Sequence, residues 1–132
     1  MRIIRIALIL LALGVVAGAF GAHGLEKVID ERSLKVWNTG VTYLFIHALG
    51  LIVIQLIYAH QFISSKSAMW SSRLLLVGIL FFSGSLFLLS TQAAIGINFR
   101  WLGPITPIGG LAFIAGWVTA ATGLKPSLKS EV

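Results

Sequence analysis

The chain contains four long apolar segments, at residues 3–22, 41–59, 74–91 and 106–123. A helix needs about 20 apolar residues to cross a hydrocarbon layer of roughly 30 Å, and each segment approaches that length with its charges at the ends. Since 58% of the residues are hydrophobic and 11% are charged, a soluble domain of this composition could not cover its core with polar surface. We therefore predict an all-α integral membrane bundle of four transmembrane helices, which forms a single domain over residues 1–132 in the lipid bilayer.

The first segment also has the outline of a secretory signal peptide. Arg2 and Arg5 precede an apolar core at residues 6–16, and small residues follow at 17–19. Cleavage of such a leader would leave three spans. The apolar run continues through residues 20–22, and this length favours a first span that is retained.

The distribution of charge predicts the orientation of the chain. The net charge is +6, but the Lys and Arg residues are scattered among the connectors, which argues against a nucleic-acid partner. More of them lie at the termini and in the second connector (Arg2, Arg5, Lys66, Arg73, Lys125 and Lys129) than in the first and third connectors (Lys27, Arg32, Lys35 and Arg100). Because positive loops tend to stay inside, we predict that both termini are cytoplasmic.

The connector between the first two segments has two different faces when it is drawn as a helix. One face is largely apolar (Leu25, Val28, Ile29, Arg32 and Val36), and the other is charged (Lys27, Asp30, Glu31 and Lys35). This pattern predicts a short interfacial helix between the first and second spans, with its apolar side on the membrane or on the bundle.

Polar residues and a proline mark where two of the spans should begin. Asn38 or Thr39 is the predicted cap of the second span, and Thr106 is the predicted start of the fourth, with Pro107 suited to the first helical position. The tail after Gly123 is predicted to be disordered or loosely associated with the membrane.

Stripes of small residues run along the first and fourth segments. They include Gly14, Gly18 and Gly21 in the first and Gly109, Ala112 and Gly116 in the fourth. In lipid, small residues let two helices approach closely, so helix packing is the expected role, and a homo-oligomer or a membrane protein partner would use the same device. The sequence leaves open whether the stripes pack within or between chains, and whether the glycines instead line a pathway or a ligand site.

Polar residues gather at the predicted outer ends of the spans. The candidate polar pocket consists of His23, Glu26, Asn38, Tyr43, His47, Gln92 and Thr106. His47 lies well inside the second span, one turn beyond Tyr43, and a histidine facing lipid would be costly, so this face should point into the bundle.

Three roles for His47 are open. A neutral imidazole could tie helices together through a hydroxyl or a backbone carbonyl, or it could help to bind a small polar molecule, a lipid headgroup or a proton. Metal binding is the weakest alternative, because His23, Glu26 and His47 match no local metal motif, and we expect neither a metal nor a cofactor.

The sequence shows no catalytic signature: it has no cysteine, no nucleophile elbow, no phosphate loop and no pair of carboxylates inside the spans. We expect a non-enzymatic protein that binds a lipid or protein partner through the outward-facing pocket. The alternative is an oligomeric conduit for small solutes or ions, although the inner halves of the spans are nearly all apolar. A membrane enzyme that uses histidine acid–base chemistry, with His23 or His47 beside Glu26, is a third possibility.

Several motifs together resemble a known family. In order they are GAFGAHGL at 18–25, YLFIHAL at 43–49, FSGSL at 82–86, GPITPIGG at 103–110 and GW at 116–117. Their order and spacing resemble the domain of unknown function 423 family, which includes the transmembrane protein 256-like group. The resemblance covers nearly the whole chain and implies a small four-helix protein of the bacterial inner membrane, with no established biochemical activity to carry over.

Overall fold

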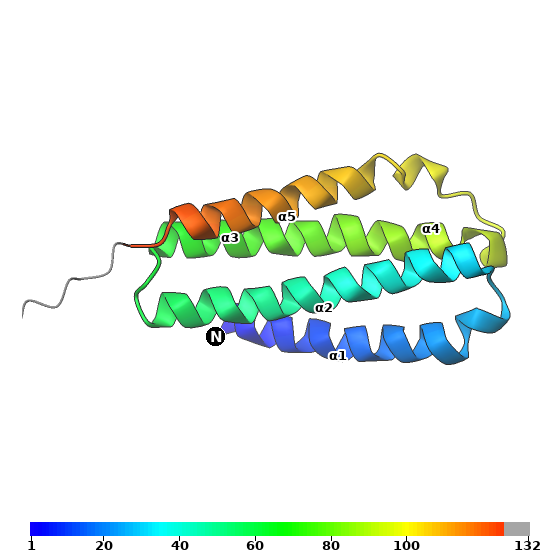
Figure 1. Ribbon diagram of the computed structural model, residues 1–132, viewed down its shortest axis with the longest axis horizontal. Coiled ribbons are helices and arrows are strands. Elements are labelled where there is room, and N and C mark those ends of the chain that lie inside the picture. Colours follow the sequence, from blue (N-terminus) through cyan, green and yellow to red (C-terminus); the bar gives the residue numbers. More distant parts are fainter. Residues whose placement is uncertain (126–132) are drawn as a thin grey trace, which may run out of the picture.

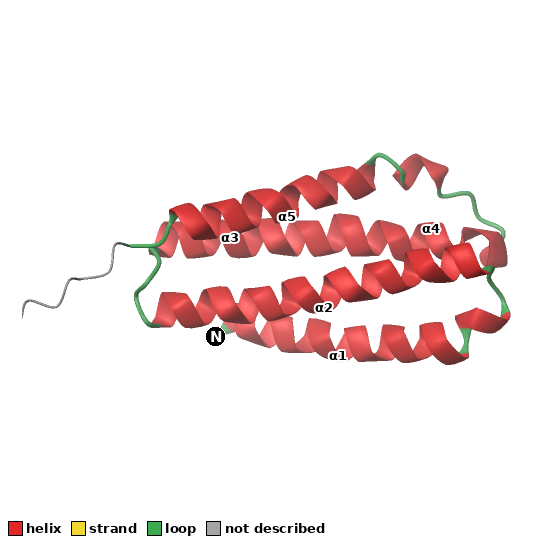
Figure 2. Ribbon diagram, in the orientation of Figure 1, coloured by secondary structure: helices red, strands yellow, loops and turns green. Residues whose placement is uncertain are grey.

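The computed structural model describes residues 1–125 as a set of long helices, and it contains no β-strand in this range (Figure 2). The elements are α1 (Arg2–His23), η1 (Leu25–Lys27), α2 (Glu31–Ala59), α3 (Ser65–Gly78), η2 (Ile79–Ser83), α4 (Gly84–Ile95), η3 (Arg100–Leu102) and α5 (Ile105–Thr122). The prediction for the tail falls largely on residues 126–132, which lie outside the described residues.

Four of the described helical stretches are long and apolar enough to cross a membrane, which confirms the predicted all-α membrane fold. They are Arg2–Lys27, Glu31–Ala59, Ser65–Ile95 and Arg100–Thr122. The start of α1, the α2–α3 connector and the end of α5 lie at one end of the molecule, which we call the terminal end (Figure 1). The connectors at 24–30 and 96–104 form the opposite, distal end.

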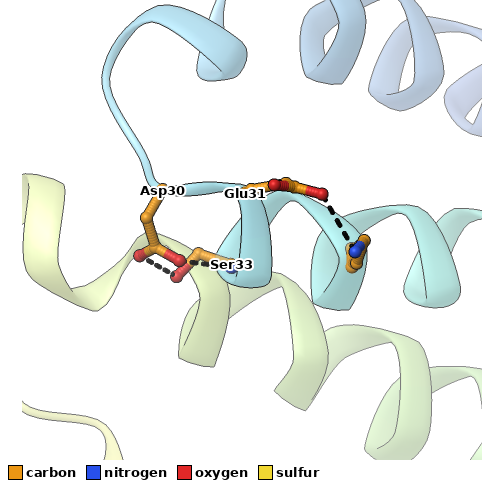
Figure 3. A network of polar contacts seen from close by, with 4 residues as sticks. Asp30, Glu31 and Ser33 are labelled. Carbon is orange, nitrogen blue, oxygen red and sulfur yellow. Dashed lines mark hydrogen bonds and ion pairs between the residues drawn. The ribbon is translucent and has the colours of Figure 1, made fainter.

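The helix α2 begins about two turns earlier than predicted. Asp30 is its N-cap, and the side chain accepts hydrogen bonds from the backbone N–H of Ser33 at 3.0 Å and from the Ser33 hydroxyl at 2.8 Å (Figure 3). These bonds stabilise the charged carboxylate and lower the pKa of Asp30. Because this cap starts the helix, the predicted cap at Asn38 or Thr39 is wrong, since both residues lie inside α2.

No separate interfacial helix forms between the first two spans in the described chain. Residues 25–27 make a single 3-10 turn, and residues 31–36 are the first turns of α2. On these turns Glu31 and Lys35 form a surface ion pair, with 2.9 Å between Oε1 and Nζ. The amphipathic pattern belongs to a turn and to the extension of a spanning helix.

The third span is one continuous helical stretch with a π-helical segment in its middle. The segment η2 (Ile79–Ser83) lies between α3 and α4 without an intervening loop. In a π-segment the backbone hydrogen bonds span five residues in place of four, and such segments are frequent at functional sites.

The fourth span begins just before its predicted start. Pro104 is the N-cap of α5 and has no side-chain capping bond, so Thr106 lies in the first turn of the helix. The Thr106 hydroxyl is 2.7 Å from the Ser85 hydroxyl on α4. The helix therefore begins one residue before the predicted start, and the Thr106 side chain joins α5 to α4.

The helices pack as a row in which α2 and the third span are central. The helix α2 packs against α1 on one side and against α3, η2 and α4 on the other, while α5 packs on α3 and η2 (Figure 1). In the most apolar window of each helix, 44% of the residues are buried in α2 but only 11% in α1. The helix α1 is thus an edge helix with most of its surface open to lipid.

Both small-residue stripes pack within the chain. A Cβ added at Gly14 would lie 3.0 Å from the Phe45 ring, and one at Gly21 would lie 2.8 Å from the Trp37 ring, so α1 uses its stripe against α2. Gly116 of α5 lies in the same way against Leu75 of α3. At these positions the stripes are occupied by contacts within the chain, and the homo-oligomer stays a prediction.

Candidate functional site

The structure distributes the predicted pocket residues over different surroundings. His23, Glu26 and Asn38 are exposed at or near the distal end. Gln92 is half-buried, and its side-chain oxygen accepts a hydrogen bond of 3.2 Å from the backbone N–H of Phe99. Among the side-chain hydrogen bonds of residues 1–125, only the one from His47 to Tyr43 joins two of the seven residues.

His47 is buried, with 4% of its surface exposed, between α2 and α5. Its Nδ1 lies 2.7 Å from the backbone carbonyl oxygen of Tyr43, and since a carbonyl can only accept, Nδ1 carries the proton. The imidazole ring stacks on the ring of Phe113 with 3.4 Å between centroids and 10° between planes. His47 thus bonds to its own helix and contacts the neighbouring helix through its face.

The rings around His47 form a cluster of Tyr43, His47, Phe82 and Phe113, which we call the aromatic cluster. Tyr43 lies 4.4 Å from Phe82, and Phe82 lies 5.7 Å from Phe113, measured between centroids. In the neutral ring with Nδ1 protonated, Nε2 is an acceptor, and it has no hydrogen-bond partner among the described residues. The cluster joins α2, η2 and α5 by ring packing.

Hydrogen bonds between the helices come mostly from residues that the sequence analysis did not select. Trp37 on α2 donates to the Ala17 carbonyl on α1 at 2.9 Å. Ser71 on α3 donates to the Gly116 carbonyl on α5 at 2.7 Å, and Gln55 on α2 donates to Ser72 on α3 at 3.0 Å. Such bonds link helices in lipid, and the serines of the third span are the signal that could have revealed them.

A second feature that the sequence did not indicate is an apolar groove beside α1. The groove has a volume of about 440 Å³ and lies between α1, α2, η2 and α4. We call it the α1–α4 groove. Its lining consists of Leu10, Leu13, Val16, Ala17, Phe20, Trp37, Leu44, Ile79, Leu80, Ser83, Gly84 and Phe87.

Ser83 brings the only side-chain hydroxyl to the lining of this groove. The residue is the last of the π-segment and is 1% exposed, and its hydroxyl oxygen has no hydrogen-bond partner in the described part of the chain. A buried hydroxyl without a partner costs about 1–3 kcal/mol on protein mutational scales. At the adjacent Gly84 a Cβ would meet no atom within 4 Å, so the groove is open there.

Metal ligands do not gather in residues 1–125. No group of three or more His, Cys, Asp or Glu side chains lies close enough together to hold a metal ion in this part of the chain.

Comparison with known proteins identifies relatives along most of the chain. A family described as "Protein of unknown function (DUF423)" matches residues 17–110. The UPF0382 membrane protein YwdK of Bacillus subtilis is 48% identical over 83% of this chain and 82% of its own length. A UPF0382 membrane protein of Schizosaccharomyces pombe is 40% identical over 90% of this chain and 98% of its own length, and one of Haemophilus influenzae is 38% identical over 89% and 86%. No solved structure matches the chain.

Proposed function

This chain belongs to the DUF423 family of membrane proteins of unknown function, and we propose that it is a non-enzymatic protein that binds a membrane lipid in the α1–α4 groove. The observation that carries this proposal is the groove itself, an apolar space of about 440 Å³ that contains a single buried hydroxyl. Sites for small ligands are commonly mostly apolar, with few polar groups that fix the orientation of the ligand.

The surroundings of the groove favour a lipid as its occupant. The groove lies between spanning helices, and α1, which forms one wall, packs chiefly on α2. The bilayer therefore supplies hydrocarbon chains directly to the opening. Within the groove a chain would contact Phe20, Trp37 and Phe87, whose rings offer a large apolar surface.

The Ser83 hydroxyl adds a chemical requirement. It needs an acceptor, because it has no partner among the described residues. A lipid carbonyl oxygen is an acceptor that the membrane can provide, and a hydrogen bond there would remove the cost of the unpaired hydroxyl. We propose a lipid that places its hydrocarbon chain along α1 and a carbonyl oxygen at Ser83, whose buried hydroxyl must rotate toward the groove to meet it.

The predicted polar residues at the distal end have a place in this proposal. His23 follows Phe20 by three residues on α1, so it continues the wall of the groove toward the distal end. We propose that His23 contacts the lipid headgroup. His47 and Tyr43 are assigned to the packing of α2 on α5, because their bonds and ring contacts lie there.

The orientation that we propose has both termini in the cytoplasm of a bacterial cell, with the protein in the inner membrane. Among residues 1–125 the terminal end carries only basic charges, from Arg2, Arg5, Lys66, Arg73 and Lys125, as the positive-inside rule requires. The groove then faces the outer leaflet. An oligomeric conduit is less favoured, because interior serines such as Ser71 and Ser72 are bonded to neighbouring helices.

The test fills the groove without disturbing the packing of the helices. Gly84→Leu adds a side chain where a Cβ meets nothing, and Ala115→Leu adds similar bulk at an exposed site on α5 as the matched control. After removal of lipid and addition of dioleoyl phosphatidylcholine, native mass spectrometry should show a retained lipid on the wild type and on Ala115→Leu but not on Gly84→Leu. Equal retention by all three proteins would refute binding in the groove.

The role of Ser83 is tested with two lipids that differ only in their carbonyl groups. The wild type should retain the diester form of phosphatidylcholine more strongly than its diether analogue, which has no carbonyl oxygen. Ser83→Ala should remove this preference, because the donor is gone. If the wild type retains both lipids equally, the groove binds the hydrocarbon chain alone and the proposed hydrogen bond is wrong.

A further inference from the structure

A cavity at the terminal end of the molecule shares no lining residue with the groove and has a different chemistry. It has a volume of about 310 Å³ and lies between the start of α1, the end of α2 and the start of α3. Its polar lining consists of Arg2, Gln55, Tyr58, Ser65, Ser72 and Arg73. From this cavity we infer a second binding site, for the phosphate of an anionic phospholipid headgroup.

Two arginines from distant parts of the sequence line the same cavity. Arg2 is the first residue of α1, and Arg73 belongs to α3. An arginine guanidinium presents a planar fork of donors that matches the geometry of a phosphate. Arg73 is also held in place, because its Cζ lies 5.4 Å from the centre of the Trp70 ring.

The remaining lining completes a site for a lipid headgroup. Tyr58 and Ser65 bring hydroxyl donors, while Ile3, Ala68 and Met69 bring an apolar wall. A phosphate can therefore lie on the polar side and the start of the hydrocarbon chains on the apolar side. A neighbouring cavity shares Tyr58 and Ser65 and is also lined by Lys125, which adds a third cation close by.

The charge at this end selects for a net negative headgroup. The acidic residues of the described chain are Glu26, Asp30 and Glu31, and all three lie at the distal end. A zwitterionic headgroup would therefore bring an ammonium group among cations, with no carboxylate from residues 1–125 at this end to meet it. Basic pockets between spanning helices on the cytoplasmic side are suited to anionic headgroups for this reason.

The general excess of basic residues at this end could by itself attract an anionic lipid. A specific site predicts more, because Arg2 and Arg73 line the cavity whereas Arg5 and Lys66 do not. The two pairs carry the same charge at the same end, so substituting each pair distinguishes binding in the cavity from attraction to a charged surface. None of the cavity residues lines the α1–α4 groove, so this inference stands apart from the proposed function.

The experiment compares Arg2→Gln/Arg73→Gln with Arg5→Gln/Lys66→Gln as the matched control, and every protein, including the parent, carries Gly84→Leu, which fills the α1–α4 groove. Delipidated protein in a neutral detergent is titrated with dioleoyl phosphatidylglycerol or dioleoyl phosphatidylcholine, and bound lipid is counted by native mass spectrometry. The parent and the control should prefer phosphatidylglycerol, and the cavity variant should bind it about 30-fold more weakly, because each removed arginine takes away a charge-assisted contact with the phosphate. Thermal unfolding of each variant checks that the fold is retained, and Tyr58→Phe, which removes one donor, should weaken binding to a smaller extent.

Three results would overturn the inference. Equal losses in the two double variants would mean that only surface charge attracts the lipid. Equal binding of the two lipids would remove the selection for an anionic headgroup. Displacement of phosphatidylglycerol by millimolar inorganic phosphate would assign the site to a water-soluble phosphate compound.

Discussion

Two adjacent glycines in α5 provide a sharp test of the packing. A Cβ added at Gly109 would fall on the backbone of the π-segment, against Phe82 and 2.9 Å from the carbonyl carbon of Phe81. At Gly110 the nearest atoms to an added Cβ belong to the Phe82 ring, at 3.8 Å, which is an ordinary contact. Gly109→Ala and Gly110→Ala therefore differ in packing but introduce the same residue into the same helix.

The size of the stability difference depends on the atoms that lie opposite each added Cβ. Overpacking costs about 1–3 kcal/mol of folding free energy and occasionally more. The backbone opposite Gly109 cannot rotate away as a side chain can, so we expect a cost near the upper end of that range. The gain in helix propensity from Gly to Ala, up to about 1 kcal/mol, applies to both positions and cancels in the comparison. Gly109→Ala should therefore unfold more easily than Gly110→Ala by about 3 kcal/mol.

The assay is unfolding in mild detergent by titration with sodium dodecyl sulfate, followed by far-ultraviolet circular dichroism. Gly110→Ala should be equal to or more stable than the wild type. If the two variants unfold together, α5 does not approach the π-segment as closely as the structure shows, and the argument for a close helix contact at Gly109 is refuted.

Three further predictions concern the helix ends. Gln61 has a left-handed φ of 60° at the end of α2, where the Phe62 N–H bonds to the Ile57 carbonyl. Because glycine adopts this φ without steric cost, Gln61→Gly should raise the free energy of unfolding by about 0.5–1 kcal/mol in the same titration. A loss of stability would contradict this account. Gly96 ends α4 with a φ of 70°, and Gly96→Ala should cost about 1 kcal/mol although its Cβ meets nothing within 4 Å; an unchanged midpoint would contradict the backbone explanation. Because the pKa of Asp30 is lowered in the folded protein, its contribution to stability should be present above the unfolded pKa of about 4 and be lost as the pH falls through the folded pKa. Asp30→Ala should therefore lower the midpoint of unfolding near neutral pH and lie closer to the wild type in acid. An equal loss of stability at both pH values would refute the linkage.

The four spans could be predicted because hydrophobic length is a property of the local sequence. Their beginnings could not be predicted equally well. Asp30 and Asn38 are both good capping residues, and only the bonds from Ser33 show that Asp30 starts α2. Asn38 then continues the helix beyond the apolar run, since a helix with a satisfied cap does not need to begin at the membrane surface.

The glycine stripes illustrate a different limit. Their spacing predicted close helix contacts, and Gly14, Gly21 and Gly116 all lie against side chains of neighbouring helices. The sequence could not identify the partner, because a small residue allows close approach to any helix, whether in the same chain or in another. The structure shows contacts within the chain, and this is why the stripes no longer support an oligomer.

The two most informative polar groups inside the bundle show why burial must be known before function is assigned. His47 stands out in the sequence as an ionisable residue in a span, yet its proton on Nδ1 is used by the Tyr43 carbonyl and its ring is covered by Phe113. Ser83 does not stand out, because the third span contains other serines, such as Ser85 and Ser90, that bond to nearby carbonyls. Only the three-dimensional arrangement shows that Ser83 has no hydrogen-bond partner among residues 1–125 and lines the apolar groove, so residue type alone did not distinguish it from the other serines.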